Sequence, residues 1–143
     1  MSHLDKLEAI AAELIAEFDV NYAPVPIETI LQNPKDDMWD KVDITQLSGS
    51  FLSLKDPYSP RMSIARLLAR HAASCPWGRE RDLFTLLREG DNLKPFARML
   101  VMPKPLVEKV STAARNPTTM SLQFEVPEDD IRIRLDEIFG AGS

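Results

Sequence analysis

The chain has 143 residues, of which 44% are hydrophobic and 27% charged, and this balance fits one compact soluble domain, residues 1–143, rather than two. Aspartate and glutamate outnumber lysine and arginine by 22 to 17, which argues against a surface devoted to nucleic acid but allows a local basic patch. The single cysteine, Cys75, excludes an internal disulfide and suits a reducing cytosol.

The N-terminal segment does not have the pattern of a targeting signal. Asp5, Glu8, Glu13 and Glu17 replace the basic region that precedes the apolar stretch of a signal peptide. No run in the sequence approaches the roughly 18 apolar residues of a membrane span. We therefore expect no signal peptide, no membrane anchor and a cytoplasmic location.

The first elements along the chain are predicted to be helices. Apolar residues recur at three-four spacing from Leu4 to Phe18, which is typical of an amphipathic helix. Pro24 and Pro26 then favour an extended segment, and Pro26 suits the first position of a short helix that continues to Leu31.

The pattern changes between residues 38 and 54. Val42 and Ile44 alternate with polar neighbours, and Phe51 and Leu52 follow a glycine. This stretch predicts one small β-sheet, so that the expected fold class is α/β (α+β) and mostly helical.

The rest of the chain is predicted to be helical. Ser59 and Pro60 form a favourable helix start, while Pro76 and Gly78 are expected to stop that helix. Further helices are predicted at residues 80–90, 92–101, 104–115 and 127–140, with a short turn at 118–124.

Two arginines occupy one face of the helix that begins at Ser59. Arg66 and Arg70 are four residues apart, which is the spacing that a zinc peptidase uses for its two histidine ligands. At about 100° per residue, the apolar stripe lies almost opposite and includes Ile64, Leu68, His71 and Cys75.

The order of several motifs resembles that of the ImmA/IrrE-type metallopeptidases. These motifs are "PVPIETIL", "LSGSF", "RMSIA", "FARMLVMPKPLVEKV" and "FEVPEDDIRIRL", and the resemblance covers roughly Leu4 to Phe139. Its most specific part is Phe96-Ala97 followed by Met102-Pro103. The resemblance implies a zincin-like metallopeptidase fold with one small β-sheet, acting in the cytoplasm on helix-turn-helix repressors.

This chain departs from that family at every catalytic position. Where the family has A-H-E-L-x-H, Arg66 and Arg70 match the two histidine ligands and Leu67 matches the general base. The third ligand, a glutamate, falls at Gly90, with Glu89 one residue away. Guanidinium stays protonated and repels Zn²⁺, and leucine cannot accept a proton from water. The resemblance therefore implies a member without the zinc chemistry.

A relocated metal site is an alternative. His71 and Cys75 are zinc ligand types at i, i+4 spacing on the same helix, although their place on the apolar stripe favours packing. A third protein ligand would have to come from Glu80, Asp82, Glu89 or His3.

Three interpretations remain for Arg66 and Arg70. They form a solvated face whose charges pair with nearby acidic residues, they hold an acidic peptide or another anion in the former cleft, or they contact nucleic acid. The residues that bear on these choices are Glu80, Asp82 and Glu89 as pairing partners, and Arg61, Arg79, Arg81 and Arg88 as further cations.

We therefore predict a zincin-like domain that has lost its active site, needs no cofactor and binds a protein partner, with a helix-turn-helix regulator as the candidate class. Membrane binding is not expected and nucleic-acid binding is disfavoured. The alternatives are a zinc-dependent peptidase with relocated ligands and an anion- or nucleic-acid-binding helix. The predicted binding cleft contains Arg66, Leu67, Arg70, Glu89, Gly90 and Phe96.

Overall fold

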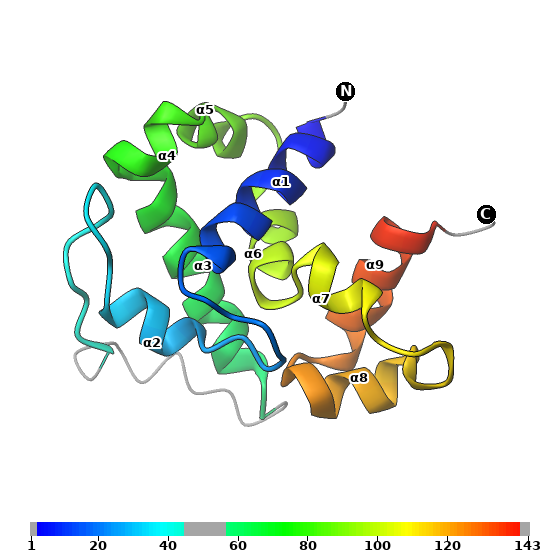
Figure 1. Cartoon of the computed structure of the whole chain (residues 1–143). Helices are drawn as coiled ribbons and strands as arrows, with labels where there is room; N and C mark the ends of the chain where they lie inside the picture. Colours follow the sequence, from blue (N-terminus) through cyan, green and yellow to red (C-terminus); the bar gives the residue numbers. More distant parts are fainter. Residues whose placement is uncertain (1–2, 45–56, 141–143) are drawn as a thin grey trace.

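The structure is a computed structural model that describes residues 3–44 and 57–140 (Figure 1). Within these ranges the regular structure is helical, and none of the described helices is long and apolar enough to cross a membrane. The elements are α1 (His3–Ala16), α2 (Ile27–Gln32), α3 (Ser59–Ser74), α4 (Pro76–Glu80), α5 (Leu83–Arg88), α6 (Leu93–Val101), α7 (Lys104–Glu108), the 3₁₀ helix η3 (Thr112–Ala114), α8 (Pro117–Phe124) and α9 (Glu128–Phe139).

The predicted α/β class, with a zincin-like fold and a small β-sheet, is wrong, because no strand occurs in the described residues. Residues 38–44 of the predicted sheet contain no strand, and Phe51 and Leu52 lie outside the described residues. Val42 and Ile44 are half-buried and pack against the core. Their alternation therefore comes from a non-strand segment that touches the core, since two alternating positions do not show whether a partner strand exists.

Most predicted helices are present, with shorter bounds in two places. The stretch 80–90 is helical at Glu80, which ends α4, and over α5, while the stretch 104–115 is helical over α7 and η3. The predicted turn at 118–124 belongs to α8. Pro76 begins a new helix, α4, because proline fits the first helical position as well as it ends the preceding helix.

Gly78 allows α4 to lie against the end of α3. A Cβ atom at this position would be 1.9 Å from the backbone carbonyl oxygen of Ala72. Only glycine fits this approach without a backbone shift, so the tight junction between α3 and α4 depends on this residue.

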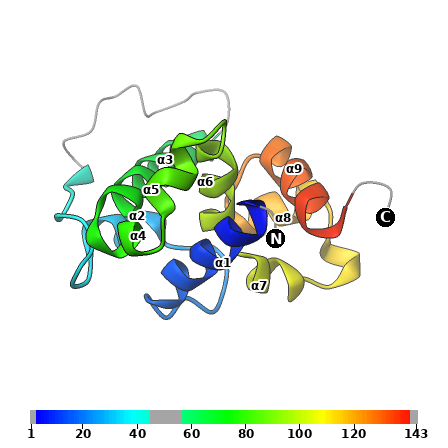
Figure 2. The same ribbon diagram turned by 90° about the horizontal axis from the view of Figure 1, so that it is seen from above.

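Two groups of helices lie on either side of α1 and α6. Figure 2 shows α2 to α5 on one side and α7 to α9 on the other, with α1 and α6 between them. Among the described helices, α3 and α6 make the most extensive contact, and α1 also packs on α6.

The buried hydrophobic residues form one cluster. Leu14, Leu68, Phe96, Leu100 and Phe124 are at most 1% exposed, and they bring together α1, α3, α6 and α8. Full burial of each such side chain stabilises a fold by about 1.5–3 kcal/mol. Packing around α6 is therefore the main support of the helical arrangement.

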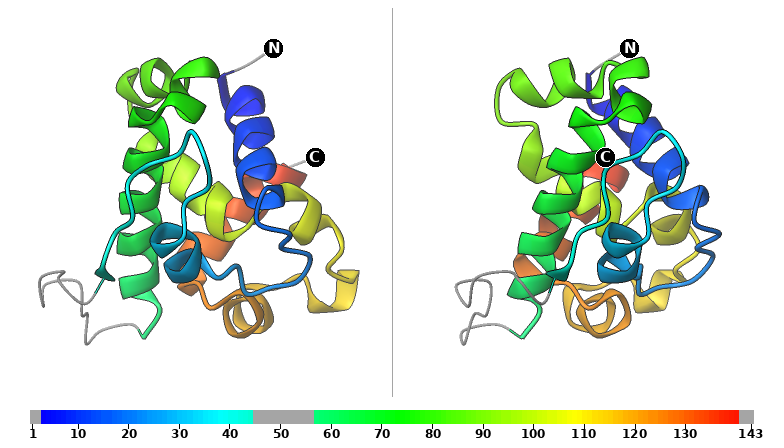
Figure 3. Two further views of the ribbon diagram at one scale, coloured as in Figure 1. Left: turned by 60° about the vertical axis from the view of Figure 1, so that its left-hand side comes forward. Right: turned by 90° about the vertical axis from the view of Figure 1, so that its left-hand side faces the viewer.

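The chain that follows α2 runs beside α3 and reaches α4 (Figure 3). The indole Nε1 of Trp39 donates to the carbonyl oxygen of Leu31 at 2.8 Å. The backbone N–H of Trp77 donates to the carbonyl oxygen of Asp37, also at 2.8 Å. These two bonds attach the segment to the end of α2 and to the start of α4.

An arginine side chain is completely buried at the junction of α1, α6 and α9. Arg134 on α9 donates from Nη2 to a carboxylate oxygen of Glu8 on α1 at 2.6 Å, and from Nε to the carbonyl oxygen of Met102 at 2.9 Å. Its Nη1 also contacts the carboxylate of Glu137 at 3.3 Å.

A second arginine extends this cluster. Arg98 on α6 lies 3.5 Å from the carboxylate of Glu137 and 3.7 Å from that of Asp130. Its side chain is 12% exposed. We call the set of Arg134, Arg98, Glu8, Glu137 and Asp130 the buried arginine network.

Candidate functional site

A hollow of about 290 Å³ lies where the second half of α3, α5 and the first residue of α6 meet. Its residues form an apolar floor with two arginines, and we call it the arginine groove. The described residues that line it are Arg70, Ala73, Ser74, Phe84, Leu87, Arg88 and Leu93.

Helical spacing on α5 explains how one short helix supplies three of these side chains. Phe84, Leu87 and Arg88 stand at i, i+3 and i+4, which places them on one face of α5. Gly90 then adopts a φ of +57°, a left-handed conformation that glycine takes without strain. This turn leads into α6 and lets Leu93 close the groove.

The groove has an unusual charge for an acidic protein. Arg70 and Arg88 are exposed, and no aspartate or glutamate is among the described residues that line it. Within the described part of the chain, Arg70 has no ion pair. Both arginine residues are therefore exposed beside half-buried apolar side chains, and no carboxylate is among the described residues that line the groove with them.

The aromatic ring of Phe84 is already in contact with cations. The guanidinium carbon of Arg79 lies 4.3 Å from the ring centroid and that of Arg88 lies 5.5 Å from it, distances at which a cation is attracted by the ring. Nε of Arg79 also donates to the carbonyl oxygen of Ser74 at 3.0 Å. Arg79 is therefore held next to the groove as a third positive charge.

The structure brings only part of the predicted cleft to this place. Arg70 lines the groove, while Arg66 is half-buried and donates to the hydroxyl of Ser63 at 3.0 Å. Leu67 is half-buried and packs against the core. Neither Arg66 nor Leu67 lines the groove. Phe96 is fully buried in the core, so its side chain offers no binding surface.

Glu89 and Gly90 lie directly beyond the groove and are exposed. Gly90 lines a neighbouring hollow of about 360 Å³ together with Asp91, Leu93 and Lys94. Leu93 lines both hollows, so the two lie side by side along the turn between α5 and α6.

Sequence reasoning missed the apolar part of the groove. Phe84, Leu87 and Leu93 are not in the predicted cleft, although the first two share a helical face with Arg88. The shared helical face of Phe84, Leu87 and Arg88 was the sequence signal that could have placed the first two residues beside the arginine. The contribution of Leu93 depends on the turn at Gly90, which periodicity does not reveal.

His71 lies in α3 and is half-buried, while Cys75 follows the last residue of α3 and is buried. Cys75 is 6% exposed and its thiol donates to the carbonyl oxygen of Ala72 at 3.1 Å. His71 is half-buried, and burial lowers the pKa of its imidazole because a charged ring would lose hydration. Both line a hollow of about 270 Å³ that also contains Asp40. Across residues 3–44 and 57–140, no three His, Cys, Asp or Glu side chains are arranged to hold a metal ion.

Two of the other arginines form double hydrogen bonds with carboxylates of the same chain. Arg61 forms two hydrogen bonds with the carboxylate of Glu28, at 2.9 and 3.2 Å. Arg81 does the same with Glu13, at 2.6 and 3.1 Å, and its guanidinium lies 4.0 Å from the ring centroid of Trp77. These two cations connect α2 with α3 and α1 with the segment after α4, and so contribute little to an open basic surface.

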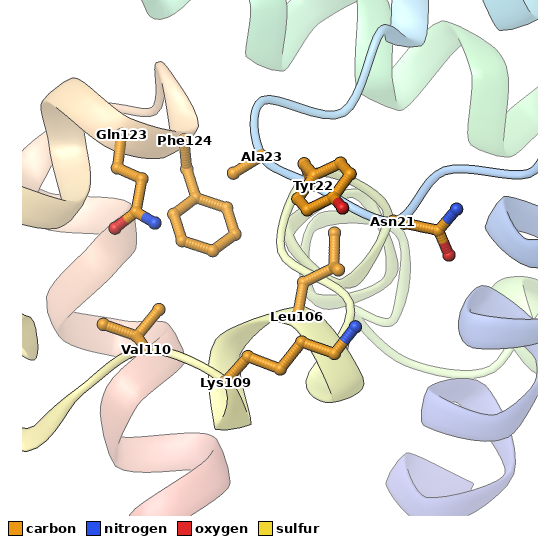
Figure 4. A pocket seen from close by; sticks show the side chains of 8 residues that line it. All are labelled: Asn21, Tyr22, Ala23, Leu106, Lys109, Val110, Gln123 and Phe124. Atoms are coloured by element: carbon orange, nitrogen blue, oxygen red, sulfur yellow. The ribbon is translucent and has the colours of Figure 1, made fainter.

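A smaller hollow of about 180 Å³ lies between the segment before α2, α7 and α8 (Figure 4). Figure 4 shows the rings of Tyr22 and Phe124 on two sides of it, with Leu106 and Val110 nearby. Among the described residues that line this hollow, only Lys109 is charged. This hollow lacks the converging charges of the arginine groove.

Comparisons with protein families, with curated proteins and with solved structures found no match for this chain. The resemblance to the ImmA/IrrE-type metallopeptidases therefore stays a prediction.

Proposed function

We propose that this protein is a non-catalytic protein-binding module, and that the arginine groove receives an acidic segment of a partner protein. The observation that carries this proposal is the combination of Arg70 and Arg88 with an apolar floor, without an acidic side chain among the described residues that line the groove. Guanidinium forks suit carboxylates, and arginine is enriched where proteins bind one another.

The size and lining of the groove favour a peptide segment as the ligand. A volume of about 290 Å³ is near the lower end of ligand pockets and accommodates one or two side chains. Phe84, Leu87 and Leu93 offer a surface for an apolar side chain, while the arginines suit its acidic neighbours. A segment with both kinds of residue satisfies both parts of the groove.

The absence of catalysis is proposed from residue chemistry. The positions that match the ligands and base of a zinc peptidase are Arg66, Arg70 and Leu67, none of which can serve that role. Under the same resemblance, a helix-turn-helix regulator is the first class of partner to test.

Nucleic-acid binding is the weaker candidate. Two of the six arginines considered for it, Arg61 and Arg81, already form double hydrogen bonds with carboxylates. Phe84 is the one aromatic residue among the described residues that line the groove, so the groove lacks the series of rings on which successive bases stack.

The test is a titration of the protein with a fluorescently labelled peptide of about 12 residues, in which Phe-Leu is flanked by glutamates. Binding is expected in the micromolar range, and Arg70→Ala with Arg88→Ala should weaken it at least about tenfold. Arg132→Ala is the control for each single substitution, Arg70→Ala and Arg88→Ala, because it removes one exposed arginine charge from α9, where the side chain pairs with Asp129 and Glu128, away from the groove.

A second peptide with glutamines in place of the glutamates should bind much more weakly. Equal binding of both peptides, or equal loss with Arg132→Ala, would contradict the proposed role of the groove. A circular dichroism melt of each variant shows whether it is folded under the conditions of the titration.

A further inference from the structure

We infer that the arginine groove selects a phosphorylated side chain in the partner segment, with an apolar residue beside it. This inference rests on the proposed function and deepens it, because it names the group that the two arginines bind.

The number of cations in the groove favours a dianion over a single carboxylate. Arg70 comes from α3 and Arg88 from α5, so two different helices contribute an arginine to the lining of one hollow. One carboxylate carries one negative charge and is satisfied by one arginine fork. A phosphate monoester carries about −1.5 to −2 at neutral pH and has three acceptor oxygens, which matches two forks.

Additional groups at the groove complement a phosphate. The exposed hydroxyl of Ser74 lies one helical turn from Arg70 and lines the same hollow, where it can donate to a third oxygen. Arg79 adds positive potential next to Ser74 and, among the described residues, has no ion pair of its own. Arginine clusters of this composition are the usual means of recognising phosphorylated and acidic motifs.

The apolar floor distinguishes a phosphorylated peptide from free phosphate. Phe84, Leu87 and Leu93 are half-buried and line the groove together with the arginines. A phosphate ion contacts only the charged groups, whereas a phosphopeptide also places a neighbouring side chain on this floor. The peptide should therefore bind far more tightly than inorganic phosphate.

The experiment compares three labelled peptides that differ at one position next to Phe-Leu, which is serine, glutamate or phosphoserine. We expect the phosphoserine peptide to bind about tenfold more tightly than the glutamate peptide, and the serine peptide to bind most weakly. Inorganic phosphate should compete only at millimolar concentration, because it lacks the apolar contact.

Arg70→Lys and Arg88→Lys provide sharper variants than alanine. Lysine keeps the positive charge but loses the planar fork that binds two oxygens at once. Each variant should therefore reduce the preference for phosphoserine over glutamate, while Arg132→Lys on α9 should leave the preference unchanged. Because charge is conserved, loss of folding is not expected, and a thermal melt verifies this.

The outcomes separate the inference from the proposed function. Equal affinity for the glutamate and phosphoserine peptides would overturn phosphate selection but leave the acidic-segment proposal intact. No binding of any peptide would overturn both. Competition by inorganic phosphate or by a single-stranded oligonucleotide at the same concentration as the phosphopeptide would also overturn the inference, in favour of a free anion or a nucleic acid.

Discussion

The buried arginine network and the arginine groove use the same side chain in opposite ways. Arg134 and Arg98 are 0% and 12% exposed and contact three carboxylates, Glu8, Glu137 and Asp130. The exposed arginines of the groove have no carboxylate among the residues that line it with them.

This difference indicates what each region does. A charge that leaves water must be paired within the protein, because an unpaired buried ion costs several kcal/mol. An exposed cation that stays unpaired adds little to stability and remains available to a ligand. The first cluster is therefore expected to govern folding, and the second is expected to govern binding.

The largest effect should follow from Arg134→Met. This substitution leaves the carboxylate of Glu8 without its partner at the junction of α1 and α9, and removes the bond to the carbonyl of Met102. We expect the free energy of unfolding to fall by about 3–5 kcal/mol, measured by urea denaturation. Arg132→Met, on the same helix but 58% exposed, is the control. If both variants lose the same free energy of unfolding, burial of the arginine does not determine the loss.

A smaller loss is expected for Glu8→Gln. The amide keeps the shape of the side chain but removes the negative charge that faces Arg134. Arg134 retains its contact with the carboxylate of Glu137. A hydrogen bond to a charged group contributes about 1.5–3 kcal/mol, so the free energy of unfolding should decrease within that range. A loss as large as that of Arg134→Met would show that Glu137 provides no compensation.

The ion pair between Arg81 and Glu13 lies between the two extremes of a buried, paired arginine and an exposed, unpaired one. Its charges are paired, but the side chain of Glu13 is 47% exposed. The hydrogen bond from Arg81 lowers the pKa of the Glu13 carboxyl. A lowered native pKa means that the stabilisation is present above the pKa of the unfolded chain and is lost as the pH falls through the native pKa.

We therefore expect Glu13→Gln to destabilise the protein by less than about 1 kcal/mol at neutral pH, and to have a smaller effect at about pH 3, which is below the pKa of a glutamate in the unfolded chain. Urea denaturation at both pH values measures the difference. The same effect at acid and neutral pH would contradict a role for the ionised carboxylate.

The smallest effect on stability is expected for Arg70→Ala with Arg88→Ala. Because both side chains are exposed and are not paired with a lining carboxylate, the free energy of unfolding should change by no more than about 0.5 kcal/mol. The same double variant should lose most of its affinity for the acidic peptide. A large loss of stability would place these arginines with the structural ones and would remove the distinction between the two regions.

Helix signals predicted much of the fold, since they act locally. Ser59 and Pro60 are the first residues of α3, although Tyr58 rather than Ser59 occupies the N-cap and no side chain caps the helix. The apolar spacing from Leu4 onward forms α1. The sheet predicted from Val42 and Ile44 is absent from the described residues, because their alternation carries no information about a partner strand.

The candidate site was predicted only in part. Arg70 lines the arginine groove, but the predicted cleft residue Phe96 belongs to the core. The groove depends on the contact of α5 with α3 and on the turn at Gly90, and these tertiary features bring Phe84 and Leu93 to the same place. Periodicity within one helix cannot show which neighbour covers a given face.

The link between α1 and α9 also sets the order in which the protein can assemble during synthesis. Glu8 and Arg134 are 126 positions apart in the chain, so the N-terminal helix emerges from the ribosome long before its charged partner exists. Contacts between residues so far apart in the sequence form late, and they lower the rate of folding. The charged contact of α1 with Arg134 can therefore form only after α9 has been synthesised, and this part of the fold is completed after α1 has already packed on α6.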